Sequence, residues 1–307
     1  MAKEKKHNYG GQAVIEGVMI RGRTSVVTAV RQPSGGIVVD AKAVSGTFSS
    51  RFRRWPLSRG VLVLLESLIL GIRSLTYSAN ISLEEEEETL SNKAIFIMLL
   101  SAAALAVGLF FLLPLGLTKL INNWVPTSSF VFNLIEGVIR LILFLAYLKL
   151  IGMMSDIKRT FMYHGAEHKT INAWEAGVPM TVEDVRNYST AHVRCGTSFL
   201  FLVLIIAILV FSLVGIHNIW LMVLSRVLLL PVIAALGYEV IYLTARYSDN
   251  WLVKIIQAPG LLLQSMTTSE PDDRQLEVAI AALNKAVEMD HEDEAVVEAV
   301  PIVPETA

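Results

Sequence analysis

The residues of this chain with the clearest chemical potential are His164-Gly165-Ala166-Glu167-His168, which lie between two apolar stretches. Two histidines four positions apart project from one face of a helix, close enough to bind a single metal ion. The order His-x-x-Glu-His is the inverse of the zincin motif, in which the histidines bind zinc and the glutamate activates water. The segment therefore predicts a divalent metal site, with zinc as the first choice and Glu167 as the general base. The simpler alternative is a structural pair of histidines that bond loop backbone or lipid headgroups.

Other side chains could complete such a site. The candidates for a third or fourth ligand are His192, Cys195, Glu175 and Glu239. Three protein ligands leave an open position for water, as in catalytic zinc sites, whereas four close the site, as in structural ones. If His192 and Cys195 both join the histidine pair, the site is closed; if either stays out, it is open. Among the carboxylates we favour Glu239, because it lies near the cytoplasmic end of a later apolar segment.

Cys195 also permits a different chemistry. It lies beside Arg194 at the expected start of a helix, and these conditions favour the thiolate. With His192 three residues earlier, nucleophilic catalysis by a Cys–His pair is an alternative. We favour a role for Cys195 in capping the helix or in binding metal.

The composition places these residues in a membrane protein. Hydrophobic residues make up 53% of the 307 residues and the mean hydropathy is +0.54. Four apolar segments are long enough to cross a bilayer, namely residues 95–117, 130–151, 198–216 and 220–243. Residues 61–75 are apolar but short and interrupted by Glu66, which is typical of an interfacial or re-entrant helix.

Basic residues in the loops predict the orientation. The loop 118–129 has a single lysine, whereas the loop 152–197 contains five lysines and arginines. By the positive-inside rule the loop 152–197 and both termini are cytoplasmic. The three cytoplasmic pieces can therefore meet on one face of the membrane.

The two ends of the chain have patterns of their own. Residues 13–20, 25–30 and 37–44 are rich in β-forming residues, and Pro33-Ser-Gly-Gly36 predicts a turn between the last two. Near the other end, Ser269 with Pro271 after it predicts a helix start. The apolar stripe of Leu276, Ile280, Leu283 and Val287 then predicts a helix that docks on the cytoplasmic domain.

The fold class that we expect is an α-helical polytopic membrane protein with four transmembrane helices, one or two interfacial helices and a small N-terminal cytoplasmic β domain. The expected parts are an N-terminal cytoplasmic β domain (8–60), an interfacial or re-entrant helix (61–80), transmembrane helices 1 and 2 (95–151), the cytoplasmic loop with the histidine motif (152–197), transmembrane helices 3 and 4 (198–243), an interfacial segment with a C-terminal cytoplasmic helix (250–289), and a disordered acidic tail (290–307).

Four blocks of residues resemble the YqhQ family. They are Gly10-Gly-Gln-Ala-Val-Ile-Glu-Gly-Val-Met-Ile-Arg-Gly22, Tyr163-His-Gly-Ala-Glu-His-Lys169, Arg194-Cys-Gly-Thr-Ser198 and Thr267-Thr-Ser-Glu-Pro271. The resemblance covers roughly residues 8–290, with one departure at Val193, where proline is expected. It implies a multi-pass protein of the bacterial cytoplasmic (inner) membrane, in a family without an assigned biochemical function that is sometimes described as metal-dependent enzymes.

The leading hypothesis is a metal-dependent enzyme, most simply a hydrolase that acts at the cytoplasmic membrane face on a peptide or lipid-linked substrate. The main alternative is a non-enzymatic accessory or assembly factor of a membrane protein complex, with a structural metal site or none. A second alternative is a small transporter, in which Glu136, Arg140 and Arg226 line a path. The lipid bilayer is an expected partner in each case. Nucleic acid is not, because no basic stripe with interleaved aromatic residues is present.

Overall fold

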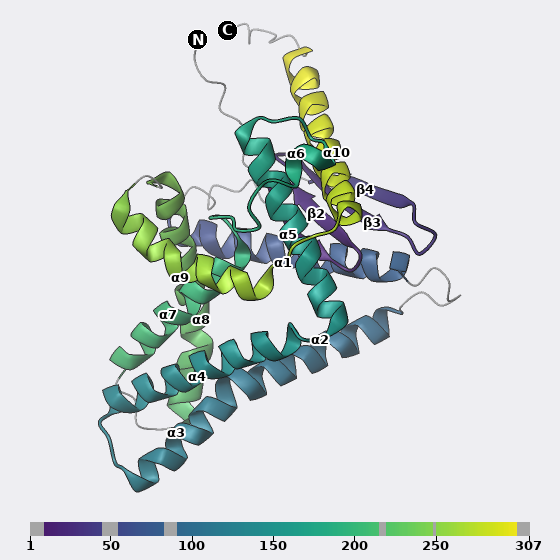
Figure 1. The fold of residues 1–307 in the computed structure, drawn as a ribbon. Helices are drawn as coiled ribbons and strands as arrows, with labels where there is room; N and C mark the ends of the chain where they lie inside the picture. Colours follow the sequence, from purple (N-terminus) through teal and green to yellow (C-terminus); the bar gives the residue numbers. More distant parts are fainter. Residues whose placement is uncertain (1–8, 45–54, 83–90, 215–218, 248–249, 300–307) are drawn as a thin grey trace, which may run out of the picture.

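The structure is a computed structural model that describes residues 9–44, 55–82, 91–214, 219–247 and 250–299. Two regions are distinct in Figure 1: a cap that contains the β-sheet, and a lobe of long helices below it. Two further helices, α1 and α9, lie between these regions. The candidate site lies where the cap meets α7 and α9.

The sheet is a meander of four antiparallel strands in the order β1-β2-β3-β4. The strands are β1 Gly10–Val14, β2 Gly17–Arg21, β3 Ser25–Arg31 and β4 Ile37–Ala43. The run 13–20, which the sequence suggested as one strand, is divided by a two-residue turn, since Val14 pairs with Gly17. Glu16 in this turn has a φ of 50°, the left-handed region that a non-glycine residue seldom adopts.

Helices α5 (Ser155–Ala176), α6 (Val182–Val185) and α10 (Asp273–Ala299) complete the cap. Side chains of β2, β3, α5 and α10 share one apolar core, in which Tyr163, Leu276 and Leu283 are fully buried. The three segments that the loop charges assign to one side of the membrane therefore pack into a single unit. The predicted apolar stripe of the C-terminal helix is confirmed by this packing.

The C-terminal helix differs from the prediction at both ends. It begins after Asp272 rather than at Ser269, because the Asp272 carboxylate accepts from Gln275 N and the Gln275 amide oxygen accepts from Asp272 N, which is a capping box. It continues to Ala299, ten residues into the segment predicted as a disordered tail. Asp290 anchors this extension, since its carboxylate accepts hydrogen bonds from the backbone N–H groups of Arg23 and Thr24. The rest of the predicted tail, residues 300–307, lies outside the described residues.

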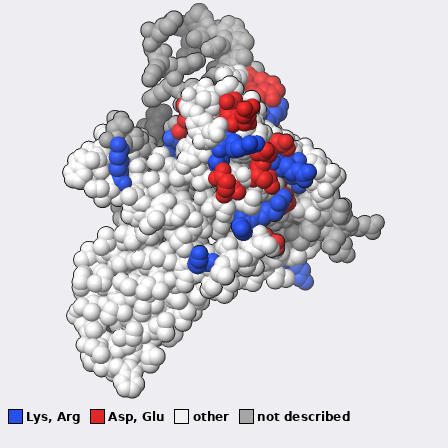
Figure 2. Space-filling model, viewed as in Figure 1, with Lys and Arg blue, Asp and Glu red and all other residues white. Residues whose placement is uncertain are grey.

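The lobe is formed by long apolar helices that pack on one another (Figure 1). They are α2 Asn92–Val107, the π-helix η3 Gly108–Leu112, α3 Leu113–Trp124, α4 Ser129–Ile151, α7 Gly196–Leu213 and α8 Ile219–Arg246. The α2–η3–α3 segment and α4 form a long antiparallel pair, α4 packs on α7, and α7 packs on α8. Figure 2 shows that charged side chains gather over the cap on the face in view, while the lobe is almost free of them.

Four helices of the described residues are long and apolar enough to cross a membrane: Ser58–Ser82, Lys93–Trp124, Gly196–Leu213 and Trp220–Thr244. Three of them correspond to predicted transmembrane segments. The first is α1, which we expected at the interface; it qualifies because it runs on from the short apolar segment to Ser82. The predicted segment 130–151 forms α4 and is not among the four. The number of candidate spans therefore agrees with the prediction, but one member of the set differs.

Helices α1 (Ser58–Ser82) and α9 (Trp251–Thr267) lie between cap and lobe. In Figure 1, α1 runs crosswise beneath the sheet. Leu70, Tyr77 and Ile81 of α1 pack against the sheet, while other apolar side chains of α1, such as Leu65 and Leu68, are exposed. Helix α9 packs on α7, and its C-terminal end leads into the segment beside the histidine motif.

Candidate metal site

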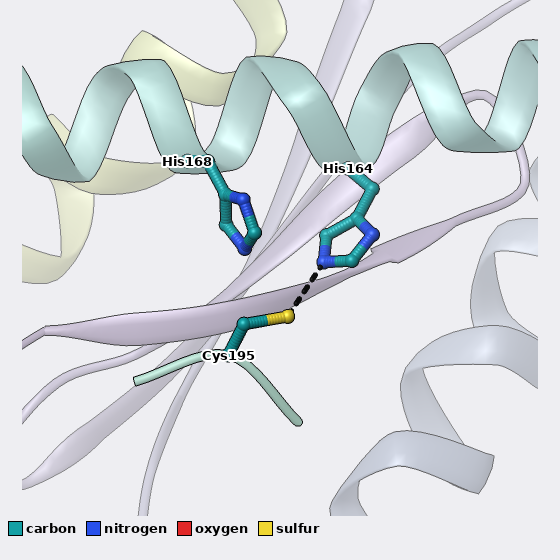
Figure 3. Close-up of side chains that lie close together, drawn as sticks. All are labelled: His164, His168 and Cys195. Carbon is teal, nitrogen blue, oxygen red and sulfur yellow. Dashed lines mark hydrogen bonds between the residues drawn. The ribbon is translucent and has the colours of Figure 1, made fainter. Parts of the chain in front are cut away.

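Helix α5 positions the two histidines of the motif. It ends at Gly177, whose φ of 77° suits a left-handed C-cap. The His164 and His168 rings project from the same face of α5, with their centroids 4.4 Å apart (Figure 3). The opposite face of the helix is fixed by the cap core, so the direction in which the rings point is set by packing.

Backbone carbonyl groups fix the orientation of both rings. His164 Nδ1 lies 2.9 Å from Thr267 O, and His168 Nδ1 lies 2.5 Å from Thr190 O. Because a carbonyl oxygen only accepts, each Nδ1 must donate the hydrogen bond, and in the neutral ring the lone pair then lies on Nε2. Metal-binding histidines show this pattern, in which an outer hydrogen bond selects the tautomer and orients the ring.

The third member of the group is Cys195, which lies at the N-terminus of α7. Its Sγ is 3.2 Å from His164 Nε2 (Figure 3) and also accepts a hydrogen bond from Thr197 N. Among the residues that the structure describes, the ligand atoms of His164, His168 and Cys195 all lie within 4.8 Å of one another. The thiol is buried, so it meets the rings in a protected position.

This donor set fits zinc in type and nearly in spacing. Zinc binds imidazole nitrogen at about 2.0–2.1 Å and thiolate sulfur at about 2.3 Å, so tetrahedral ligand atoms lie about 3.3–3.6 Å apart. The His164–Cys195 pair is already close to that separation. The group needs only a small contraction of the remaining distances to hold a metal ion. Three such ligands leave a fourth position open.

Glu167, the predicted general base, lies next to His168. Its Oε2 is 3.5 Å from His168 Nε2, and the side chain is buried. Burial raises the pKa of Glu167 above its ordinary value, against the opposing effects of the His164 and His192 rings and of a hydrogen bond from Gly11 N–H. A buried carboxyl group this close to His168 Nε2 is placed to exchange a proton with a further ligand of a metal held there.

His192 is close to this group but not part of it. Its ring centroid lies 5.7 Å from that of His168, and its Nε2 is 3.7 Å from a carboxylate oxygen of Glu175. That Nε2 is buried and has no hydrogen-bond partner among the described residues. Burial lowers the pKa of His192, and the nearby Glu167 carboxyl only partly opposes this effect. His192 is therefore a neutral ring with an unused nitrogen at the edge of the site.

The structure places the other two predicted carboxylates elsewhere. Glu239 binds Arg59, with its oxygens 2.8 Å from Nε and 2.5 Å from Nη2, and it also accepts from Leu57 N. Glu175 pairs with Arg194. Neither belongs to the group of His164, His168 and Cys195. The structure does not bring Glu239 to this group, because α1 packs on α8 and supplies Arg59 to that carboxylate.

Two residues that shape the site were missed in the sequence. Gln264 is fully buried in α9; its amide accepts from His192 N and donates to His192 O, and it also donates to Ser198 Oγ. A glutamine inside an apolar segment is the signal that could have marked it. Gly165 lets α5 approach the backbone after α9, since a Cβ there would lie 2.2 Å from Ser269 O.

The fold and the site define a class: a mostly helical protein whose four apolar helices are compatible with a multi-pass bacterial membrane protein, with a His-His-Cys group where the cap meets the start of α7. The chain belongs to the family described as "Protein of unknown function (DUF1385)", which matches residues 55–289. It is 36% identical over 298 residues to "Uncharacterized protein YqhQ" of Bacillus subtilis (strain 168). The aligned region covers 92% of this chain and 93% of that relative. The resemblance to the YqhQ family is thus confirmed. No solved structure matches the chain.

Proposed function

We propose that this protein binds one divalent metal ion, zinc in the first instance, through His164 Nε2, His168 Nε2 and Cys195 Sγ. We further propose that it is a metal-dependent hydrolase at the cytoplasmic face of the bacterial inner membrane. The observation that carries the proposal is the pair of Nδ1–carbonyl hydrogen bonds, which leave two Nε2 lone pairs beside one thiol. Histidines that merely packed in the cap would not need the same tautomer.

The arrangement supports hydrolysis because it leaves one coordination position open and puts a carboxyl group next to it. A metal ion in such a site supplies Lewis acidity and lowers the pKa of water. Glu167 would take the proton of the attacking water and return it to the leaving group. Since Cys195 begins α7 and Thr267 ends α9, the site adjoins helices that we expect in or on the bilayer, which favours a lipid-linked or membrane peptide substrate.

The buried Nε2 of His192, which has no hydrogen-bond partner among the described residues, favours a second candidate, a structural metal site in an accessory or assembly factor. If the His192 ring moves toward His168, four ligands enclose the metal and no position remains for water. Such a site would hold the cap against α7 and α9 and would need no general base.

Metal analysis of the full chain, purified in detergent, tests both candidates. Elemental mass spectrometry should find close to one metal per chain in the wild type and in Glu167→Gln, and much less in His164→Ala. His291→Ala, which removes an exposed histidine of α10, is the matched control and should retain the metal. Retention in His192→Ala supports the open site, whereas its loss there supports the closed one. A wild-type protein that binds no metal, even when zinc is supplied, refutes both.

A further inference from the structure

A second cluster of charged residues lies in the lobe, away from the cap. Glu136 of α4 pairs through Oε1 with Arg140 Nη2 and through Oε2 with Arg226 Nη2 of α8. Asn133 Oδ1 accepts a further hydrogen bond from Arg226 Nη2 at 2.9 Å. All four residues are buried, with at most 5% of their surface exposed. Glu136 and Arg140 are four residues apart on α4, and Arg226 joins this pair from a position 90 residues away in sequence.

The cluster contains more positive than negative charge. Arginine side chains stay charged in proteins, and Glu136 supplies one negative charge at most. Among the described residues, the ion pairs of Arg140 and Arg226 both go to this one carboxylate. In addition, Arg226 Nε is buried and has no hydrogen-bond partner within the described chain. An uncompensated charge and an unused donor are costly in an apolar lobe, so residues of this kind mark binding sites there.

Two cavities lie beside the cluster. One, of about 190 Å³, is lined by Glu136 and Arg226 together with apolar side chains of α2, η3, α3 and α8. The other, of about 220 Å³, is lined by Arg140 and by apolar side chains of η3, α4, α7 and α8. Phe111 and Leu230 line both cavities, so the two adjoin. Apart from the ionic residues, every side chain in the two walls is apolar.

The π-helical turn η3 shapes the common wall. Arg140 Nε donates to Phe110 O at 2.7 Å, which ties the guanidinium to this turn. Phe110 and Phe111 of η3 line the cavities, and the Arg140 guanidinium lies 5.3 Å from the Phe111 ring centroid. Single π-helical turns within α-helices occur frequently at functional sites, because they redirect side chains and free backbone carbonyl groups.

We propose that these cavities bind an amphiphilic monoanion, namely one long apolar chain that ends in a carboxylate. The carboxylate would bind Arg226 and balance the excess positive charge, while the chain would lie between Phe111 and Leu230. Each cavity is smaller than the roughly 300–1,000 Å³ of pockets that enclose drug-sized ligands. A single chain therefore fits better than the glycerol backbone and two chains of a phospholipid. This site is independent of the metal site proposed in the cap.

Binding of oleate to the full chain in detergent tests this proposal, with oleyl alcohol as the uncharged analogue of the same length. Radiolabelled oleate should bind saturably and about tenfold or more tightly than oleyl alcohol, because the alcohol lacks the charge-assisted hydrogen bond. Arg226→Gln should remove this preference. Lys149→Gln, which removes an exposed positive charge of α4, is the control and should keep the preference for oleate.

Arg226→Gln could fail to fold, so a second variant tests the cavity alone. Val227 lines the first cavity and is mostly exposed, and Val227→Trp would fill that cavity while every residue of the ionic cluster is kept. It should weaken oleate binding about tenfold or more while the metal content stays unchanged. Equal binding of oleate and oleyl alcohol by the wild type would overturn the proposal. So would unaltered binding in Val227→Trp, or binding of phosphatidylglycerol in preference to oleate.

Discussion

Gly165→Ala is the substitution for which the structure predicts the opposite of what helix propensity predicts. Alanine is favoured over glycine inside a helix by about 1 kcal/mol, so propensity alone makes this variant more stable. The added Cβ, however, would lie 2.2 Å from Ser269 O and 3.2 Å from Thr190 Cγ2. Ordinary contact begins near 3.4 Å, so the Ser269 carbonyl must move back by about 1.2 Å.

The size of the effect follows from this overlap. Overpacking of a well-packed interior costs roughly 1–3 kcal/mol, which exceeds the gain in propensity. The displaced backbone also carries Thr267 O, which orients His164, while the second contact presses on Thr190, whose carbonyl orients His168. Loss of such an outer hydrogen bond lowers metal affinity about 10–100-fold. Gly165→Ala should therefore lose both stability and zinc affinity.

Gly116→Ala supplies the matched comparison, because Gly116 lies inside α3 and a Cβ there meets nothing within 4 Å. This variant should gain up to about 1 kcal/mol in the free energy of unfolding. Unfolding of both variants in detergent, together with a zinc titration against a competing chelator, gives the two readouts. If Gly165→Ala is as stable as Gly116→Ala and binds zinc like the wild type, the close approach of α5 to Ser269 does not set the site.

Three further predictions concern single side chains. Burial raises the pKa of Asp290, but hydrogen bonds from Arg23 and Thr24 outweigh this effect, so the pKa is lowered. Asp290→Asn should therefore lower the free energy of unfolding by about 1.5–3 kcal/mol at pH 7. A lowered pKa stabilises the fold only while the carboxylate is charged. The difference in free energy of unfolding between the wild type and Asp290→Asn should therefore become smaller as the pH falls below about 4, and unfolding curves at pH 7 and pH 3 measure it. Glu136→Gln leaves two guanidinium groups without their carboxylate and should lower the free energy of unfolding by about 3–5 kcal/mol, an effect that thermal unfolding would detect; a neutral result would contradict the proposed excess of positive charge. Cys195→Ser should weaken zinc binding by at least the roughly 10–100-fold that loss of an outer hydrogen bond causes. The unfolding temperature without metal should stay the same, since serine is also a good helix N-cap; equal zinc affinity would exclude the thiol as a ligand.

Local signals in the sequence were sufficient for the elements that carry the site. The spacing of His164 and His168, the helix around them and its end at Gly177 all follow from rules that involve a few neighbouring residues. The same is true of the stripe on the C-terminal helix. These features depend on periodicity and capping, which are encoded within one segment.

Contacts between distant segments could not be predicted in this way. The carbonyl groups of Thr190 and Thr267 orient the histidines, yet a backbone carbonyl belongs to every residue and has no sequence signature. The pairing of Glu239 with Arg59 could not be foreseen, because Arg59 is 180 residues away and reaches Glu239 only through the packing of α1 on α8. Ser269 and Asp272 are both good N-cap residues, and only the fold shows that Ser269 N instead donates to Phe161 O of α5.

The origin of the site's parts also decides which experiments separate the two proposed functions. His164 and His168 come from α5, Cys195 from the start of α7, and one outer hydrogen bond from the end of α9, so the group exists only when cap and helices are assembled. A metal that binds only this assembly stabilises it by about 2.7 kcal/mol at a concentration 100 times its dissociation constant, whether the site is catalytic or structural. Stabilisation by zinc therefore tests for a site but not for its purpose. Glu167 differs in this respect, because it contributes no atom to the group; Glu167→Gln should keep the zinc-dependent stabilisation in full, and only an enzyme would lose its function with that change.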